Sequence, residues 1–437
     1  MKFYNREKEL ALFDSIKEQS YKQAKMTVLL GRRRIGKTSL LKKANESDNS
    51  TVYFFAARKN EVLLCEEFVE LVRQKLGVRI FGSVHSFKDL FHYLMELSLE
   101  RSFTLIIDEF QEFFSVNPSV YSDMQNIWDS FKDDSKINLI LCGSIYSLMN
   151  RIFENAKEPL FGRATDRIVL KEFTPSTIKK IFADNYPGYK NEDLLAFYTI
   201  TGGVAKYVEL LVSKNAFTLD AILSEIYREN SLFINEGKNL LIEEFGRDYA
   251  TYFSILSLIA SSKTSRPEIE SVLETSVGGH LERLEKDFGI IRKVQPILAK
   301  SGGRNIKYTI EDNFLNFWFR FVYKYQSAVE IGNFDYIRNI VERDYKMYSG
   351  RVLEKYFIEG FKEQKKYSTI GTYWEKRNQN EIDIVAINDF EKTLLFAEVK
   401  RKKEKISMQE LQEKSLNIRK AFKGYEVDYK ALSIEEM

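Results

Sequence analysis

The sequence contains few of the residues that build disulfides and metal centres. Its 437 residues include two cysteines, Cys65 and Cys142, which lie far apart in apolar runs and cannot form a disulfide framework or a zinc cluster. The three histidines are His85, His92 and His280, and no cysteine or suitably spaced carboxylate completes a metal set around them. We therefore expect a protein of a reducing compartment that does not depend on structural zinc.

Long hydrophobic runs are also missing. No apolar stretch approaches the ~18 residues that a membrane helix needs, and the first residues lack the apolar core of a signal peptide. Neither sign of charge is in excess, because 66 Lys and Arg residues face 63 Asp and Glu residues, a formal net charge of +3. These absences predict a soluble, cytoplasmic protein with no membrane partner, and they neither require nor exclude nucleic acid.

The sequence does contain a complete G-x-x-x-x-G-K-[ST] motif between an apolar, β-forming run and a helix-forming run. Glycines let backbone N–H groups point at phosphate oxygens, and the N-terminus of the following helix adds positive potential. Lys37 is predicted to reach the β- and γ-phosphates of ATP, and the Thr38 hydroxyl to ligate Mg²⁺. The predicted nucleotide-binding residues are Gly31, Arg32, Arg33, Arg34, Ile35, Gly36, Lys37, Thr38, Ser39 and Ser144.

A second apolar run, residues 103–107, ends in Asp108 and Glu109. A strand that ends in two acids is typical of the other half of a P-loop ATPase site. Asp108 is therefore predicted to hold Mg²⁺ opposite Thr38. Glu109 is predicted to orient or deprotonate the attacking water.

Two further residues are candidates for this site. Ser144 follows the apolar run 137–142, and ligands gather at the carboxyl ends of parallel strands, although a turn serine fits the same pattern. Arg163, and after it Arg167, could neutralise charge on the transferring phosphoryl group, in the same subunit or across an interface. The alternative for either arginine is a surface salt bridge.

The order of the predicted elements indicates an α/β fold with several domains. Strands that alternate with helices imply right-handed crossovers and a parallel sheet covered on both faces. After Pro175 the pattern becomes helical, and Gly202 and Gly203 interrupt it with a turn or a close backbone approach. The predicted domains are a P-loop ATPase core at 1–175, a helical lid at 176–240, a winged helix at 241–325 and a C-terminal domain at 326–437.

The predicted winged helix raises the question of DNA binding. Its third helix carries the charges of Glu282, Arg283, Glu285, Lys286 and Asp287, three acids and two bases, which suit phosphates poorly. The predicted wing carries Lys300, Arg304 and Lys307, which suit them better. DNA binding is one interpretation, and a packing or regulatory role is the other.

The C-terminal region contains a second acidic set. Glu354 lies in a helical segment, Asp383 in a β-like run, and Glu398 and Lys400 two residues apart at the end of another. Because side chains alternate between the two faces of a strand, Glu398 and Lys400 lie on the same side of it. Asp383 and Glu398 are predicted to hold Mg²⁺ while Lys400 positions or activates water for phosphodiester cleavage. A scaffold without catalytic activity fits the same residues.

Taken together, the chain resembles the archaeal-type ATPases of the AAA-related STAND group that carry a restriction-endonuclease-like C-terminal domain. The matching segments are residues 3–7, 31–38, 107–109, 143–144, 159–163, 201–204, 381–383 and 398–400. Ala205 stands where that family commonly has proline. The resemblance implies a PD-(D/E)XK nuclease-like fold for the last domain, with Glu354, Asp383, Glu398 and Lys400 at the positions of its motif.

Three functional hypotheses follow. The first is a Mg²⁺-dependent ATPase switch that relays its nucleotide state to a C-terminal nuclease-like effector. The second is an ATP-regulated DNA-binding protein or nuclease. The third is an interaction scaffold that binds ATP with little turnover and whose partner is another protein or a second copy of the chain.

Overall fold

The computed structural model describes all residues except 1, 81, 300–302, 304 and 376–378. The described chain forms two compact units, Lys2–Lys171 and Glu172–Met437. The finer division at residues 240 and 325 stays a prediction. Each unit is described by itself below.

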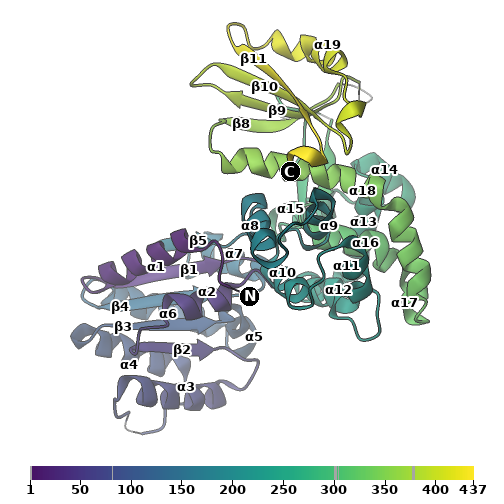
Figure 1. The fold of residues 1–437 in the computed structure, drawn as a ribbon. Helices are drawn as coiled ribbons and strands as arrows, with labels where there is room; N and C mark the ends of the chain where they lie inside the picture. The colour runs from purple at the N-terminus through teal and green to yellow at the C-terminus, as the bar shows by residue number, and fades with distance from the viewer. Residues whose placement is uncertain (1, 81, 300–302, 304, 376–378) are drawn as a thin grey trace. The chain divides into compact units, whose positions relative to one another are not determined.

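A five-stranded parallel sheet forms the centre of the N-terminal unit (Figure 1). The strand order is β2-β3-β4-β1-β5, and every neighbouring pair is parallel. The strands are β1 (Lys25–Leu30), β2 (Thr51–Phe55), β3 (Phe103–Asp108), β4 (Ile137–Cys142) and β5 (Asp166–Val169). The predicted α/β class is confirmed.

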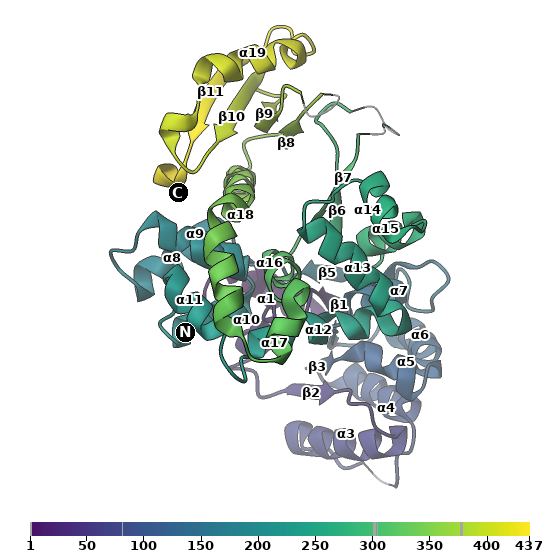
Figure 2. The same cartoon turned by 90° about the vertical axis from the view of Figure 1, so that its right-hand side faces the viewer.

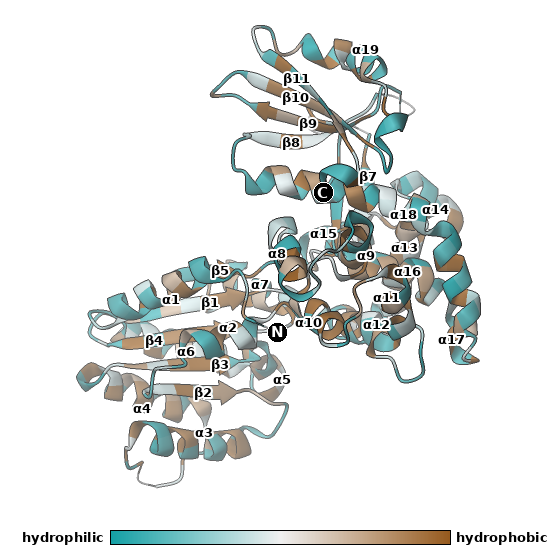
Figure 3. Ribbon diagram, viewed as in Figure 1, coloured by the Kyte–Doolittle hydropathy of each residue, from teal (hydrophilic) through white to brown (hydrophobic). Residues whose placement is uncertain are grey.

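Helices cover both faces of this sheet, which explains why β3 and β4 are buried along their whole length. On one face, α1 (Glu7–Ser20) and α2 (Lys37–Ala44) pack against one set of strand side chains. The helices that pack on the other face are α3 (Glu61–Leu76), α4 (Phe87–Glu100), α6 (Ser119–Phe131) and α7 (Tyr146–Glu154), with the short η1 (Phe110–Glu112) and α5 (Phe113–Val116). Figure 3 shows hydrophobic residues gathered along the strands.

The C-terminal unit begins with a run of helices. They are α8 (Pro175–Asn185), α9 (Asn191–Thr201), α10 (Ala205–Ser213), α11 (Leu219–Ile226) and α12 (Leu232–Phe245), followed by η2 (Gly246–Asp248). Gly202 and Gly203 separate α9 from α10, both with positive φ. At Gly203 a Cβ atom would lie 2.2 Å from the carbonyl oxygen of Phe173, so the predicted close backbone approach is confirmed.

Three helices and a hairpin follow, in the order predicted for a winged helix. The helices are α13 (Tyr249–Ala260), α14 (Arg266–Leu273) and α15 (Gly278–Lys286), and the antiparallel hairpin is β6 (Ile291–Val294) and β7 (Lys307–Ile310). Next comes α16 (Asn313–Phe321). Its aromatic residues are all buried and belong to the core: Phe314, Phe317, Trp318, Phe319 and Phe321.

A four-stranded sheet completes this unit. Its order is β11-β10-β9-β8, with β10 and β11 parallel and the other pairs antiparallel. The elements in chain order are η3 (Tyr323–Tyr325), α17 (Gln326–Glu330), α18 (Phe334–Glu363), β8 (Thr369–Tyr373), β9 (Ile382–Asn388), β10 (Thr393–Val399), η5 (Lys403–Lys405), α19 (Met408–Arg419), β11 (Glu426–Leu432) and η6 (Ile434–Glu436). Helix α18 contacts α8, α9 and α16 as well as this sheet (Figure 2).

The connection between β6 and β7 packs against the C-terminal sheet through one residue, Ile297. The backbone N–H of Ile297 donates to the carbonyl of Thr372, a residue of the edge strand β8, at 2.8 Å. The Ile297 side chain is buried in the same core cluster as Ile382 and Phe396. Lys307 on β7 lies 4.4 Å from the ring centre of Trp374. The connection therefore packs against the C-terminal sheet through Ile297, while β6 and β7 form a separate two-stranded sheet.

Candidate nucleotide site and C-terminal acidic cluster

The phosphate loop has the conformation that its glycines allow. Gly31 has φ +152°, and a Cβ atom there would lie 2.9 Å from the carbonyl oxygen of Leu170. Gly36 has φ 96° and caps the N-terminus of α2. Because the first N–H groups of a helix have no partner within it, this end of α2 is available to an anion.

Lys37 points into the loop. Its ammonium donates to the carbonyl oxygens of Gly31 at 2.6 Å and of Arg32 at 2.9 Å. Burial lowers the pKa of Lys37, and the nearby Cys142, Glu109 and Asp108 act in the opposite direction. A buried ammonium held by two neutral carbonyls can move to phosphate oxygens, because its attraction to anionic oxygens is stronger than its attraction to neutral ones.

The structure brings Thr38 and Asp108 together although they are distant in sequence. The Thr38 hydroxyl donates to Oδ2 of Asp108 at 3.2 Å, and the Tyr53 hydroxyl donates to the same oxygen. The backbone N–H of Glu109 donates to Oδ1 at 2.9 Å. Asp108 is 4% exposed. A hydroxyl and a carboxylate in contact are a donor set of the kind that Mg²⁺ prefers.

Glu109 and Ser144 are also brought together. Oε2 of Glu109 accepts from the Ser144 hydroxyl at 2.6 Å, from the Ser144 N–H at 3.3 Å and from Nε2 of Gln111 at 2.6 Å. The Ser144 hydroxyl also accepts from Nε of Arg33 at 3.2 Å. The Glu109 backbone has φ 54°, which is uncommon for a residue other than glycine. This carboxylate is thus fixed by its backbone and by two side chains.

The residues of this site fit a nucleoside triphosphate with Mg²⁺. The glycine loop leaves no room for a Cβ atom at Gly31, and α2 begins at the loop. Thr38 and Asp108 are the residues that could supply oxygen ligands to a metal ion. Among the other predicted binding residues, Ile35 is buried against the sheet, whereas Ser39 and Arg34 are exposed.

The C-terminal acidic cluster is assembled from one helix and two strands. Asp383 on β9 accepts from the backbone N–H of Val399 at 2.8 Å, and the Lys400 ammonium lies 3.4 Å from its Oδ2. The same ammonium lies 2.9 Å from Oε1 of Glu398. Glu354 on α18 faces this pair, and burial together with Asp383 raises the pKa of Glu354 to about 8. The predicted juxtaposition of these residues is therefore observed.

Two details of this cluster bear on metal binding. Oε2 of Glu398 is buried and has no hydrogen-bond partner. Lys400 and Lys414 both approach its other oxygen, at 2.9 Å and 3.5 Å. Within the described residues, no three His, Cys, Asp or Glu side chains are grouped closely enough to hold a metal ion. Metal binding by Asp383 and Glu398 thus stays a prediction.

Comparison with known proteins identifies the family. Residues 3–211 match the model of an ATPase domain found predominantly in Archaea, and residues 318–415 match archaeal and bacterial proteins of unknown function. The uncharacterised protein MJECL04 of Methanocaldococcus jannaschii is 31% identical over 412 residues, which are 92% of this chain and 88% of that protein. The chain belongs to this archaeal ATPase family. It is an ATP-binding P-loop ATPase.

One of the similar solved structures supports this fold. A Walker-type ATPase of Pyrococcus abyssi aligns with a TM-score of 0.55 and 19% identity, covering 72% of this chain and 96% of that one. The ORC2 protein of Aeropyrum pernix aligns with a TM-score of 0.44 and 14% identity, covering 71% and 90%. The first likeness supports the fold of the archaeal ATPase family. In the described part of the chain, no helix is long and apolar enough to cross a membrane.

Two arginines predicted near the phosphates have other partners in the structure. Arg163 pairs with Asp129 at 2.9 Å, and it also donates to the carbonyl of Phe161. Arg167 pairs with Glu154 at 3.1 Å. These are the surface ion pairs that the sequence left open as the alternative, and a role for either arginine in ATP hydrolysis stays a prediction.

Sequence reasoning missed several residues of the nucleotide site. Tyr53 contacts Asp108, and Gln111 contacts Glu109. Cys142 lies near Asp108, and burial followed by that carboxylate raises the pKa of its thiol well above the usual range. The sequence signal for Tyr53 was a side-chain hydroxyl within the apolar run of β2. Only the strand order places that hydroxyl beside Asp108.

The charges of the predicted DNA-binding module are engaged within the chain. On α15, Lys286 pairs with Glu282 at 2.6 Å and Arg283 with Asp287 at 3.8 Å. Lys307 on the hairpin pairs with Glu381 at 3.4 Å. Lys300 and Arg304, the other predicted phosphate contacts, lie outside the described residues.

Proposed function

We propose that this ATPase is a Mg²⁺-dependent nucleotide switch whose state is relayed to the C-terminal domain. The contact between Thr38 and Asp108 carries the proposal. It joins the end of the phosphate loop to the end of a buried strand, through two groups that can share one metal ion. Mg²⁺, when bound there, would neutralise part of the negative charge of the phosphates.

The chain's own residues supply the remaining parts. Lys37, now held by two loop carbonyls, would bind phosphate oxygens and hold the nucleotide in register. Glu109 would accept a proton from the attacking water. Ser144 and Gln111 hold the same oxygen of Glu109, so a change at Ser144 would alter the position of the base. Ser144 could thereby couple the occupant of the loop to catalysis.

Contacts inside the C-terminal unit support the relay. Arg401, the neighbour of Lys400, pairs with Glu192 on α9 at 2.5 Å and donates to Ser349 on α18 at 2.5 Å. Lys179 on α8 donates to the carbonyl of Met437 at 2.8 Å. A displacement of α8 and α9 would therefore act directly on the strand end that carries Lys400.

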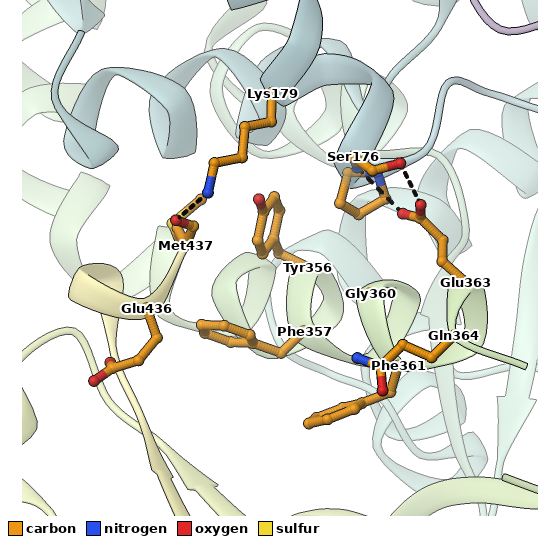
Figure 4. Close-up of a pocket in the computed structure, with 11 residues that line it drawn as sticks. Ser176, Lys179, Tyr356, Phe357, Gly360, Phe361, Glu363, Gln364, Glu436 and Met437 are labelled. Carbon is orange, nitrogen blue, oxygen red and sulfur yellow. Dashed lines mark hydrogen bonds between the residues drawn. The ribbon is translucent and has the colours of Figure 1, made fainter. Parts of the chain in front are cut away.

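The packing around α8 sets what such a displacement would require. A pocket of about 420 Å³ lies between α8, α18 and the final residues, and Figure 4 shows its wall. Tyr356 and Phe357 line it, while Ser176 and Glu363 are hydrogen-bonded across it. A shift of α8 against α18 would first have to break the contacts of Ser176 with Glu363 and of Lys179 with Met437.

ATP turnover with and without Mg²⁺ tests the switch. We expect Lys37→Ala to lower ATP hydrolysis at least 100-fold, because the ammonium that binds the phosphates is lost. Lys42→Ala, an exposed lysine on the same helix, is the matched control and should leave turnover unchanged. Equal rates in wild type and Lys37→Ala would refute the hydrolytic site. Tight ATP binding with negligible turnover in the wild type would instead favour the ATP-binding scaffold.

A second proposed function is Mg²⁺-dependent phosphodiester cleavage at the acidic cluster, and one observation favours it. The unpartnered Oε2 of Glu398 is a buried carboxylate oxygen that lacks a cation or a donor. Asp383 lies beside it, and Lys400 spans the two carboxylates. A metal ion on these acids would activate water, and Lys400 could then position it.

Plasmid cleavage by the full chain, with ATP and Mg²⁺ or Mn²⁺, measures this activity. We expect cleavage by the wild type and none above background by Asp383→Asn, which keeps the shape of the side chain but removes its charge. Asp428→Asn on the exposed face of β11 is the matched control. Absence of cutting by the wild type, or equal cutting by Asp383→Asn, would reject the nuclease and leave a non-catalytic effector.

A further inference from the structure

The register of the N-terminal sheet places Tyr53 beside the predicted metal site. Tyr53 on β2 pairs with Ile106 on β3, and Phe55 pairs with Asp108. Side chains alternate along a strand, so Tyr53, Ile106 and Asp108 share one face of the sheet. Asp108 lies two residues after Ile106 on β3 and is the next side chain on that face. A diagonal neighbour on the adjacent strand lies within reach of a long aromatic side chain. The tyrosine hydroxyl can therefore reach the carboxylate at the strand end.

The hydroxyl makes this contact. It donates to Oδ2 of Asp108, the oxygen that also accepts from Thr38 at 3.2 Å. Oδ1 is held from the other side by the N–H of Glu109 at 2.9 Å. Three donors from three elements thus fix the position and rotation of one carboxylate. Tyr53 is the donor among them that belongs to neither the phosphate loop nor the acidic strand end.

We propose that Tyr53 is a positioning residue for the metal ion of the ATPase. By donating to Asp108, its hydroxyl holds the carboxylate where Thr38 and Asp108 meet, so that both can face one Mg²⁺. The proposal rests on the proposed function, because Asp108 must hold the metal. Outer hydrogen-bond partners of metal ligands typically contribute 10- to 100-fold to metal affinity or activity.

The packing of the Tyr53 ring supports this role. The ring packs against the same core as Leu40 and Leu41 of α2. Tyr53→Phe retains the ring and removes the donor.

Metal binding and turnover in Tyr53→Phe test the proposal. We expect the Mg²⁺ concentration for half-maximal ATP hydrolysis to rise at least 10-fold, while the rate at saturating Mg²⁺ stays within a few-fold of wild type. Titration of Mn²⁺ into the ADP-loaded protein, followed by electron paramagnetic resonance of free Mn²⁺, should show the same weakening without turnover. ADP binding in EDTA and the unfolding midpoint should stay unchanged.

Two reference variants separate the possible failures. Tyr93→Phe alters a tyrosine that packs on the opposite face of the sheet, and it should leave every readout unchanged. Asp108→Asn should abolish the Mg²⁺-dependent ATP hydrolysis. Wild-type turnover that does not depend on Mg²⁺, or that survives in Asp108→Asn, would overturn the metal site and the role of Tyr53 together. If Asp108→Asn abolishes hydrolysis as expected but Tyr53→Phe binds Mn²⁺ as tightly as the wild type, the role of Tyr53 alone would be overturned.

Discussion

Glu109→Gln should lower ATP hydrolysis by about 10²- to 10⁴-fold, the range that a positioned general base contributes. The amide has the shape of the carboxylate and can still accept from Ser144, which now donates to Oε2 at 2.6 Å. It cannot take a proton from water. ATP affinity should therefore stay within a few-fold of wild type. Single-turnover hydrolysis and equilibrium binding of a fluorescent ATP analogue measure the two quantities.

The matched control for this variant is Glu46→Gln. Glu46 is an exposed carboxylate just after α2 that pairs with Lys43 at 2.6 Å, and its replacement should leave hydrolysis unchanged. Turnover by Glu109→Gln above one tenth of the wild-type rate would assign the proton transfer to another group. Loss of ATP binding in this variant would instead show that Glu109 holds the fold of the loop.

Gly203→Ala should destabilise the C-terminal unit by roughly 3–5 kcal/mol, at the upper end of single substitutions. The residue has φ +82°, which strains any residue with a Cβ atom. The added carbon would lie 2.2 Å from the carbonyl oxygen of Phe173. The N–H of Phe173 also donates to the carbonyl of Gly203 at 2.8 Å, so two backbone segments are in direct contact. No flexible side chain can move to relieve the clash.

Urea unfolding followed by circular dichroism and tryptophan fluorescence measures this loss. Gly350→Ala provides the matched control, because Gly350 lies inside α18 and a Cβ atom there would meet nothing within 4 Å. It should stabilise the protein by up to about 1 kcal/mol through helix propensity. A loss below 1 kcal/mol for Gly203→Ala would mean that the two segments separate readily.

The nucleotide site was predictable where its residues are adjacent in sequence. The loop from Gly31 to Thr38 and the acids after β3 have local signatures, and parallel strands bring such ends to one edge of the sheet. Contacts that depend on strand order were not predictable. Tyr53 meets Asp108 only because β2 pairs with β3, and many strand orders were compatible with the same sequence.

The C-terminal cluster shows the same limit. The alternation of side chains along a strand placed Glu398 and Lys400 on one side. The distance of 2.9 Å between the Lys400 ammonium and Oε1 of Glu398 agrees with this prediction. Lys414 was missed because it reaches Glu398 from α19, a helix with no local link to the cluster. Arg163 was a candidate for the phosphates with a surface salt bridge as the alternative, and the identity of its partner, Asp129, could not be foreseen without the packing of α6.

The docking of Ile297 has a consequence for how this protein can be divided. A fragment that begins at residue 326, where the sequence suggests the last domain starts, would lack Ile297 and leave a hole among Ile382, Phe396 and their neighbours. It would also lose the Ile297 N–H that donates to Thr372, so the edge strand β8 would present one more free carbonyl, and exposed edges invite pairing between molecules. The core of the last sheet is thus completed by a side chain from a distant segment, and we expect a fragment that starts before residue 297 to be more stable than one that starts at residue 326.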